Sequence, residues 1–166
     1  IAKSVDNNQT VEVIAEQAQK ELKVDAVSIL VKSPSSQSFA CLARRGFHTK
    51  ALVYTNLAMG EGLAGQAASK RQIIRIDNLE EKSSFAKTPE LANENFISYW
   101  GVPLISKGKV NGVLEIFHRK ALLPNAEWES FLTTLAGQAA IAIDNASLFT
   151  DLQKSNQDLR LAYDST

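Results

Sequence analysis

Residues 60–77 of this chain read GEGLAGQAASKRQIIRID, and residues 96–119 read FISYWGVPLISKGKVNGVLEIFHR. The first stretch has three glycines in six residues, followed by a short helical segment and an apolar strand that ends at Asp77. The second predicts two strands joined by a tight turn at Gly108, since glycine adopts the backbone angles that such turns need. A glycine-rich bend that leads into a helix, followed by a hairpin, can wall a small-molecule pocket against one face of a sheet.

The flanking sequence predicts two long helices and three further strands. Apolar residues recur at three- and four-residue steps in residues 10–22 and from Asn125 onward, which is the spacing of one helical face. The expected N-caps are Asn7, Asn8 or Thr10 for the first helix and Asn125 for the last. Short helices are expected around residues 49–54 and 89–94. The expected strands are residues 26–31, 38–45, 73–76, 96–105 and 110–118.

This order of elements predicts an α+β domain with a central antiparallel sheet. The first and last helices each have an apolar side, so we expect them to pack side by side on one face of the sheet. The irregular middle segments and short helices must then cover the other face. A ligand pocket would lie under that cover.

Composition excludes several classes of partner. The 166 residues contain 18 Lys and Arg and 18 Asp and Glu, so no general field attracts nucleic acid or an acidic membrane. No apolar run approaches the ~20 residues that span a bilayer. A single cysteine, Cys41, permits no intrachain disulfide and no cysteine-based zinc cluster, which agrees with the reducing cytoplasm. The chain begins without an initiator Met, and we expect it to be cut from a longer protein.

Catalytic motifs are not evident in the sequence. It contains no nucleophile elbow, Walker loop, HExxH or CxxC pattern. GEGLAG matches the GxGxxG spacing, but no strand clearly leads into it and no βαβ unit surrounds it. We therefore expect no catalytic residue, no metal site and no enzymatic activity in this segment.

Glu115 is the most informative charged residue, because it lies mid-strand among apolar neighbours and shares a face with Val113 and Phe117. A buried carboxylate needs a partner, which is either a ligand or a salt bridge to Arg44, Arg45 or Arg75. Aromatic residues could line a pocket or simply form core, and the glycines could contact a ligand or shape a turn. The candidate ligand-binding residues are Phe39, Cys41, Tyr54, Gly62, Gly65, Phe96, Trp100, Glu115 and Phe117.

The last helix continues beyond the residues that would face the sheet. Apolar residues at alternating steps of three and four form a heptad seam, with a polar Asn at one a position, which favours two-stranded coiled coils. We therefore expect a parallel homodimer, with the alternative that the tail packs on its own domain. The division is residues 1–149 for the domain and 150–166 for a connector helix. The seam residues are Phe149, Leu152, Asn156, Leu159 and Tyr163.

Four stretches together resemble the GAF domain family, the ligand-sensing modules of signalling proteins: residues 60–68, 73–78, 99–117 and 131–149. The resemblance implies a central antiparallel sheet, terminal helices on one face and a ligand pocket on the other. The NKxnFxxxDE signature of cyclic-nucleotide-binding members is not evident, and Cys41 does not match the bilin-attaching cysteine. Ligand and cofactor are therefore unknown.

The tail LFTDLQKSNQDLRLAYDST resembles the connector between a GAF domain and a following HD-GYP domain, the class that hydrolyses cyclic di-GMP. The resemblance implies a cytoplasmic bacterial sensor that signals through its C-terminal helix to an output domain absent from this chain. The alternatives are a sensor for a diguanylate cyclase or histidine kinase, or a ligand-free dimerisation spacer. A methionine sulfoxide reductase of this fold is disfavoured, because its redox cycle needs several cysteines.

Overall fold

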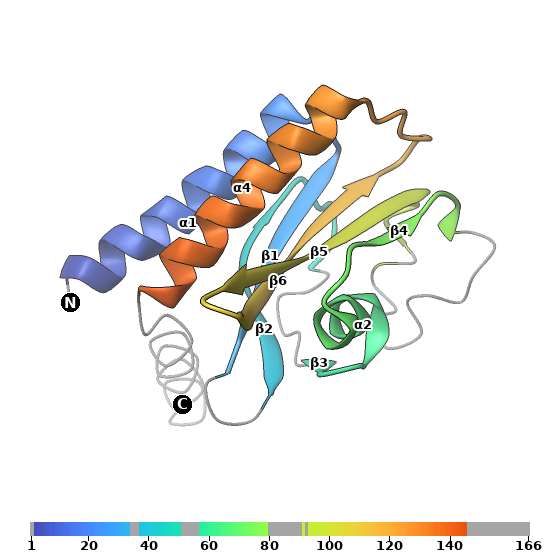
Figure 1. The fold of residues 1–166 in the computed structure, drawn as a ribbon. Helices are drawn as coiled ribbons and strands as arrows, with labels where there is room; N and C mark the ends of the chain where they lie inside the picture. Colours follow the sequence, from blue (N-terminus) through green and yellow to red (C-terminus); the bar gives the residue numbers. More distant parts are fainter. Residues whose placement is uncertain (1, 34–36, 51–56, 80–90, 92, 146–166) are drawn as a thin grey trace, which may run out of the picture.

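A computed structural model describes residues 2–33, 37–50, 57–79, 91 and 93–145 of the chain (Figure 1). The strands come in consecutive groups between the helices, which is the order expected for an α+β domain. In chain order they are α1 (Ala2–Glu21), β1 (Ala26–Lys32), β2 (Ser38–Arg45), β3 (Leu57–Ala58), α2 (Gly62–Lys70), β4 (Ile74–Ile76), β5 (Ser98–Ser106), β6 (Lys109–His118) and α4 (Ala126–Asp144).

The strands form one six-stranded sheet in the order β3-β2-β1-β6-β5-β4, and every neighbouring pair is antiparallel. Of the two central strands, β1 is buried along almost its whole length and β6 is buried from Gly112 to Phe117. This burial follows from their sequences, because the buried stretches, AVSILV and GVLEIF, each contain a single polar residue.

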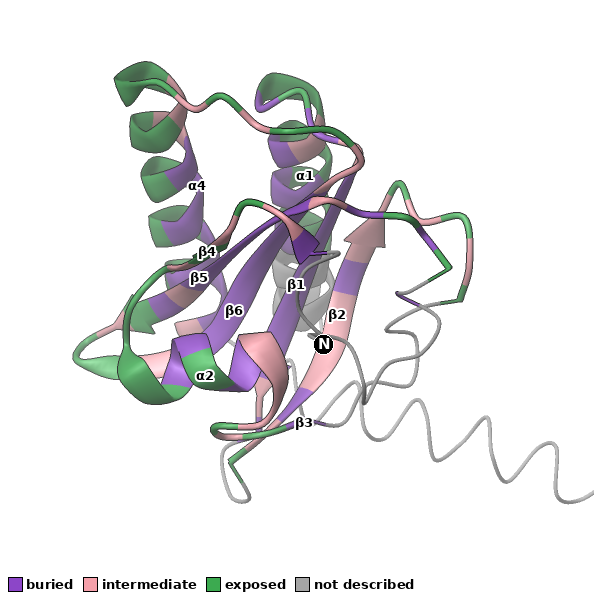
Figure 2. Cartoon of the chain, turned by 90° about the vertical axis from the view of Figure 1, so that its right-hand side faces the viewer, coloured by how far each residue is buried: buried purple, intermediate pink, exposed green. Residues whose placement is uncertain are grey.

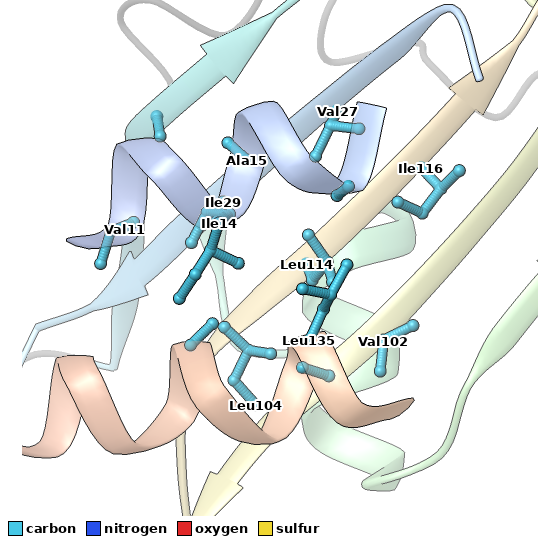
Figure 3. Close-up of a cluster of buried hydrophobic side chains, with 14 of the residues drawn as sticks. Val11, Ile14, Ala15, Val27, Ile29, Val102, Leu104, Leu114, Ile116 and Leu135 are labelled. Atoms are coloured by element: carbon cyan, nitrogen blue, oxygen red, sulfur yellow. The ribbon is translucent and has the colours of Figure 1, made fainter. Parts of the chain in front are cut away.

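Helices α1 and α4 lie side by side on one face of the sheet, as the sequence predicts (Figure 1). Their apolar sides and one side of the sheet together form the main hydrophobic core (Figure 3). The indole Nε1 of Trp128 in α4 also donates a hydrogen bond to the carbonyl oxygen of Leu22 at the end of α1, at 3.0 Å. The core includes Val11, Ile14, Ala15, Val27, Ile29, Val102, Leu104, Leu114, Ile116 and Leu135.

Helix α2 lies across the opposite face (Figure 2). It packs close to β5 and β6 because its buried side is made of small residues, Ala64, Ala67 and Ala68. Gly65 is required by close approach, since a Cβ there would lie 2.5 Å from the carbonyl oxygen of Ala58. The structure therefore supplies a packing reason for Gly65 that needs no ligand.

Several element boundaries differ from those predicted. Helix α1 begins at Ala2, not near Thr10, so Asn7, Asn8 and Thr10 lie inside it and do not cap it. Amphipathic spacing located the helix but not the residue at which it begins. Strand β4 begins at Ile74 and β5 at Ser98, slightly later than expected, and the two-residue β3 was not predicted.

The N-cap of α4 is confirmed: the side chain of Asn125 accepts a hydrogen bond from the backbone N–H of Trp128 at 2.8 Å. The short helices expected around residues 49–54 and 89–94 fall largely outside the described residues. Of the helices within the described ranges, none has the length and apolar character to cross a membrane.

Candidate functional site

The face covered by α2 carries a row of small and polar residues across the middle of the sheet. Strand register aligns Ser28 of β1 with Glu115 of β6, and Glu115 with Gly101 of β5. Tyr99 lies on the same face as Gly101, because strand residues two apart point to the same side. A polar group thus lies on an otherwise apolar surface.

Glu115 is only 4% exposed, and two hydroxyl groups donate to its carboxylate. The Ser28 hydroxyl reaches Oε1 at 2.9 Å, and the Tyr99 hydroxyl reaches Oε2 at 2.5 Å. The Tyr99 ring extends over Gly101, where a Cβ would lie 2.6 Å from the tyrosine hydroxyl. Burial raises the pKa of Glu115, although the hydrogen bonds from Tyr99 and Ser28 oppose the rise.

The salt-bridge alternative for Glu115 is wrong for all three arginines considered. Arg44 stacks over the Phe47 ring at 4.9 Å and donates to the carbonyl oxygen of Thr49. Arg45 pairs with Glu16 at 3.6 Å, and Arg75 pairs with Asp77 at 2.8 Å. The two hydroxyls occupy only part of a carboxylate's capacity to accept hydrogen bonds, so, with respect to the described residues, Glu115 retains capacity for a ligand donor.

The raised pKa of Glu115 makes a prediction about pH. Below the unfolded-state value near 4.5 both states are protonated. As pH rises, the unfolded state ionises first, and wild-type stability falls until the folded carboxyl has also ionised. The glutamine in Glu115→Gln does not ionise, so the variant should not show this fall. Its free energy of unfolding relative to that of the wild type should therefore increase as pH rises above about 4.5. Urea unfolding at several pH values tests this, and parallel pH profiles would contradict it.

Cys41 lies on the same side of the sheet but has no sign of reactivity. Its thiol donates to the carbonyl oxygen of Ala43 at 3.4 Å. Burial raises its pKa to about 12, with a further rise from Glu115. A thiol with that pKa is protonated at neutral pH and is a poor nucleophile.

Three of the aromatic candidates pack on the face of the sheet that α2 covers. Phe96 and Phe117 form a cluster with Phe47 and Tyr99, with ring centroids 4.8–5.7 Å apart. Phe39 is fully buried in a neighbouring cluster under α2. Close packing explains all of them as core, and their roles as ligand contacts stay a prediction.

The prediction that Trp100 contacts a ligand beside Glu115 is wrong. It packs in the core under α1 and α4, and its ring meets Trp128 of α4 at 5.1 Å. Alternation along β5 sends Trp100 to the helix face and Tyr99 and Gly101 to the opposite face. Trp100 therefore cannot line a site with Glu115.

Some predicted residues lie outside the described part of the chain. They are Tyr54 and the five seam residues Phe149, Leu152, Asn156, Leu159 and Tyr163. Gly62 begins α2 with a φ of +66°, which explains glycine there through backbone conformation.

Sequence reasoning missed the two hydroxyl donors to Glu115, Ser28 and Tyr99. Each is a polar group inside an apolar strand, and strand pairing would have been needed to bring them to Glu115. It also missed Glu94, whose partners lie far away in the sequence.

Glu94 is a second buried carboxylate, 1% exposed, at one end of the sheet. Its Oε1 accepts from the backbone N–H of His48 at 3.0 Å and from Nη2 of Arg119 at 2.6 Å. Its Oε2 accepts from the backbone N–H and hydroxyl of Thr49, at 2.7 and 2.6 Å. Burial raises the pKa of Glu94, but these hydrogen bonds outweigh it and the net pKa is lowered.

The fold defines a class: an α+β domain with a helix pair on one sheet face and a buried polar cluster on the other. A family model described as GAF domain matches residues 4–144, and the chain belongs to this family. Among the described residues, no group of three or more His, Cys, Asp or Glu is arranged to hold a metal ion.

Similar proteins include phosphotransferases and a sensor by name. The GAF domain of an Acinetobacter phosphoenolpyruvate-protein phosphotransferase is 27% identical, with a TM-score of 0.74, covering 84% of this chain and 83% of that one. An Escherichia coli K12 protein named phosphoenolpyruvate-dependent phosphotransferase system is 24% identical over 76% of this chain. A methyl sulfide methyltransferase-associated sensor of Methanosarcina acetivorans is 26% identical over 76% of this chain.

The chain spans only a small part of these two full-length relatives, 17% and 13% of their lengths. A GAF domain/HD domain protein of Geobacter sulfurreducens shares the fold, with a TM-score of 0.71 at 15% identity, over 86% of this chain and 94% of that one. The GAF fold thus occurs with different partner domains.

Proposed function

We propose that this chain is a regulatory GAF domain that binds a small molecule on the face that carries Glu115. The observation that carries the proposal is the Glu115 carboxylate, buried, without a cation from Arg44, Arg45 or Arg75, and held by Ser28 and Tyr99. Keeping a carboxylate in such a place costs stability, and a polar ligand anchor is a reason to retain it. The segment itself is proposed to be non-catalytic and cytoplasmic.

A route from this face to the helix layer supports a signalling role. Tyr99 contacts Glu115, while the next residue, Trp100, contacts Trp128 of α4. The Ser98 hydroxyl also donates to the carbonyl oxygen of Lys120 at 2.9 Å and accepts from the N–H of Leu122 at 3.2 Å. A ligand that moves β5 would therefore act on α4 and on the segment that leads into it.

The output is proposed to lie in the same polypeptide, beyond the connector of residues 150–166. The resemblance of the tail to GAF–HD-GYP connectors supports a cyclic di-GMP phosphodiesterase as the output. The heptad seam would form a parallel homodimer. The regulated domain would come after this seam in the chain. A ligand-free domain that serves only as a dimerisation spacer is the second candidate.

Native mass spectrometry of the purified chain, followed by denaturation and small-molecule analysis, tests the ligand. A stoichiometric bound mass that is lost in Glu115→Gln, with Glu21→Gln as the exposed control, is the expected result. A dimer with no added mass in either form would favour the spacer.

Deleting the residues after Asn145 tests the route of transmission. The seam supplies most of the apolar residues of the connector, so the truncated chain should dimerise at least about tenfold more weakly. Sedimentation velocity over a concentration series measures this. Unchanged dimer affinity would show that the connector helix does not hold the dimer together, and would contradict transmission through it.

A further inference from the structure

The four donors around Glu94 form a complete binding site for an oxyanion. Each carboxylate oxygen receives two hydrogen bonds: Oε1 from His48 and Arg119, and Oε2 from the N–H and hydroxyl of Thr49. Consecutive backbone N–H groups and an arginine are the chemistry with which proteins bind carboxylates and phosphates. We call this set of donors the Glu94 cradle.

Arg119 is held in place by groups other than the Glu94 carboxylate. Its guanidinium lies over the Phe96 ring at 4.6 Å, and its Nε donates to the backbone carbonyl of Glu94 at 2.8 Å. Its own backbone N–H donates to Oδ2 of Asp25 at 2.7 Å. The cation would therefore keep its position if the carboxylate were withdrawn.

The two backbone donors come shortly after a closely packed residue. They follow Gly46, whose φ is +84° and which packs directly on the carbonyl oxygen of Asp25. The donors therefore come from the packed ends of β2 and β6. Glu94 itself comes from a turn: Asn95 has a φ of +62°, and Glu94 N–H bonds to the carbonyl oxygen of Leu91.

We propose that the Glu94 cradle is a binding site for a small carboxylate, which Glu94 occupies from within the chain. An external carboxylate and Glu94 then compete for the same four donors. Displacement of the Glu94 side chain would break its hydrogen bonds to residues 48–49, so the exchange would also change how the turn of residues 93–95 is joined to that segment. This site is separate from Glu115 and does not depend on the function proposed there.

Competition predicts that formate stabilises the wild type less than it stabilises a variant that lacks the Glu94 carboxylate. A tethered group acts at an effective concentration in the millimolar range or above, so formate should stabilise the wild type little. In Glu94→Ala the cradle is vacated. Formate should then raise the Tm by about 3–5 °C when present at about tenfold over its Kd.

The experiment is thermal unfolding of the chain and its variants in sodium formate, with sodium chloride at equal ionic strength as the control. The double variant Glu94→Ala/Thr49→Val lacks one donor and should need about tenfold more formate for the same shift. Glu21→Gln, an exposed substitution that keeps Glu94, should behave like the wild type. Equal responses of Glu94→Ala to formate and chloride would overturn the proposal.

Glu94→Ala could be unfolded without an anion, and recovery of its folded state in formate but not in chloride would then be the supporting result. If it stays unfolded throughout, Glu94→Asp decides. Its carboxylate is one methylene shorter and leaves part of the cradle open, so formate should raise its Tm above that in chloride. No such rise in either variant would overturn the proposal and leave the role of Glu115 untouched.

Discussion

Glu94→Gln is expected to lower the free energy of unfolding by about 3–4 kcal/mol at neutral pH, because it breaks a buried ion pair and leaves its partner charged. The Arg119 side chain is 21% exposed and that of Glu94 is fully buried, so water can replace little of the lost interaction. The amide group also brings N–H donors toward the N–H groups of His48 and Thr49. Urea unfolding measures the change.

The matched control is Glu21→Gln, at the exposed end of α1, which should change stability by less than about 0.5 kcal/mol. The pH dependence gives a second check. The pKa of Glu94 is lowered by folding, so its contribution is complete above the unfolded value near 4.5 and is lost as pH falls through the folded value. The difference between wild type and Glu94→Gln should therefore shrink in acid, and a difference independent of pH would contradict this account.

Gly46→Ala is expected to lower the free energy of unfolding by about 3–5 kcal/mol, or to prevent folding. Two costs combine at this position. The φ of +84° is unfavourable for alanine, and the new Cβ would overlap the carbonyl oxygen of Asp25 and approach Nε2 of Gln19. Because the overlapped atom belongs to the backbone of the turn before β1, a side-chain rotation cannot relieve it.

Gly108→Ala separates these two costs. Gly108 has a similar φ of +77°, but nothing lies within 4 Å of the Cβ position. It should lose only about 1 kcal/mol, which is the conformational cost alone. Chemical unfolding of the two variants side by side gives the steric cost by difference, and equal losses would show that the contact with Asp25 is relieved by small shifts.

The sequence was sufficient where structure is decided by neighbours in the chain. The period of apolar residues located both long helices, and Asn125 marked the start of α4 through its own hydrogen bond to Trp128. Period-two alternation placed Glu115 with Val113 and Phe117. The same alternation, with the β5–β6 register that pairs Trp100 with Ile116, would have placed Trp100 on the helix face.

Glu94 could not have been found in this way. Its partners His48 and Thr49 lie 46 and 45 residues away, and Arg119 lies 25 residues away. Contacts between loops leave no periodic pattern in the sequence. The contacts of Glu94 form only when three separate segments of the chain have come together. Ser28 and Tyr99 are an intermediate case, because only the register across β1, β6 and β5 brings them to Glu115.

The contact between Trp100 and Trp128 gives the domain an optical reporter of its own. The chain has two tryptophans, and both belong to this contact between β5 and α4, with ring centroids 5.1 Å apart. Intrinsic tryptophan fluorescence therefore reports on one place in the molecule, the junction of the sheet and helix α4. A change in emission on adding a small molecule would signal movement at that junction without any label, in the isolated chain.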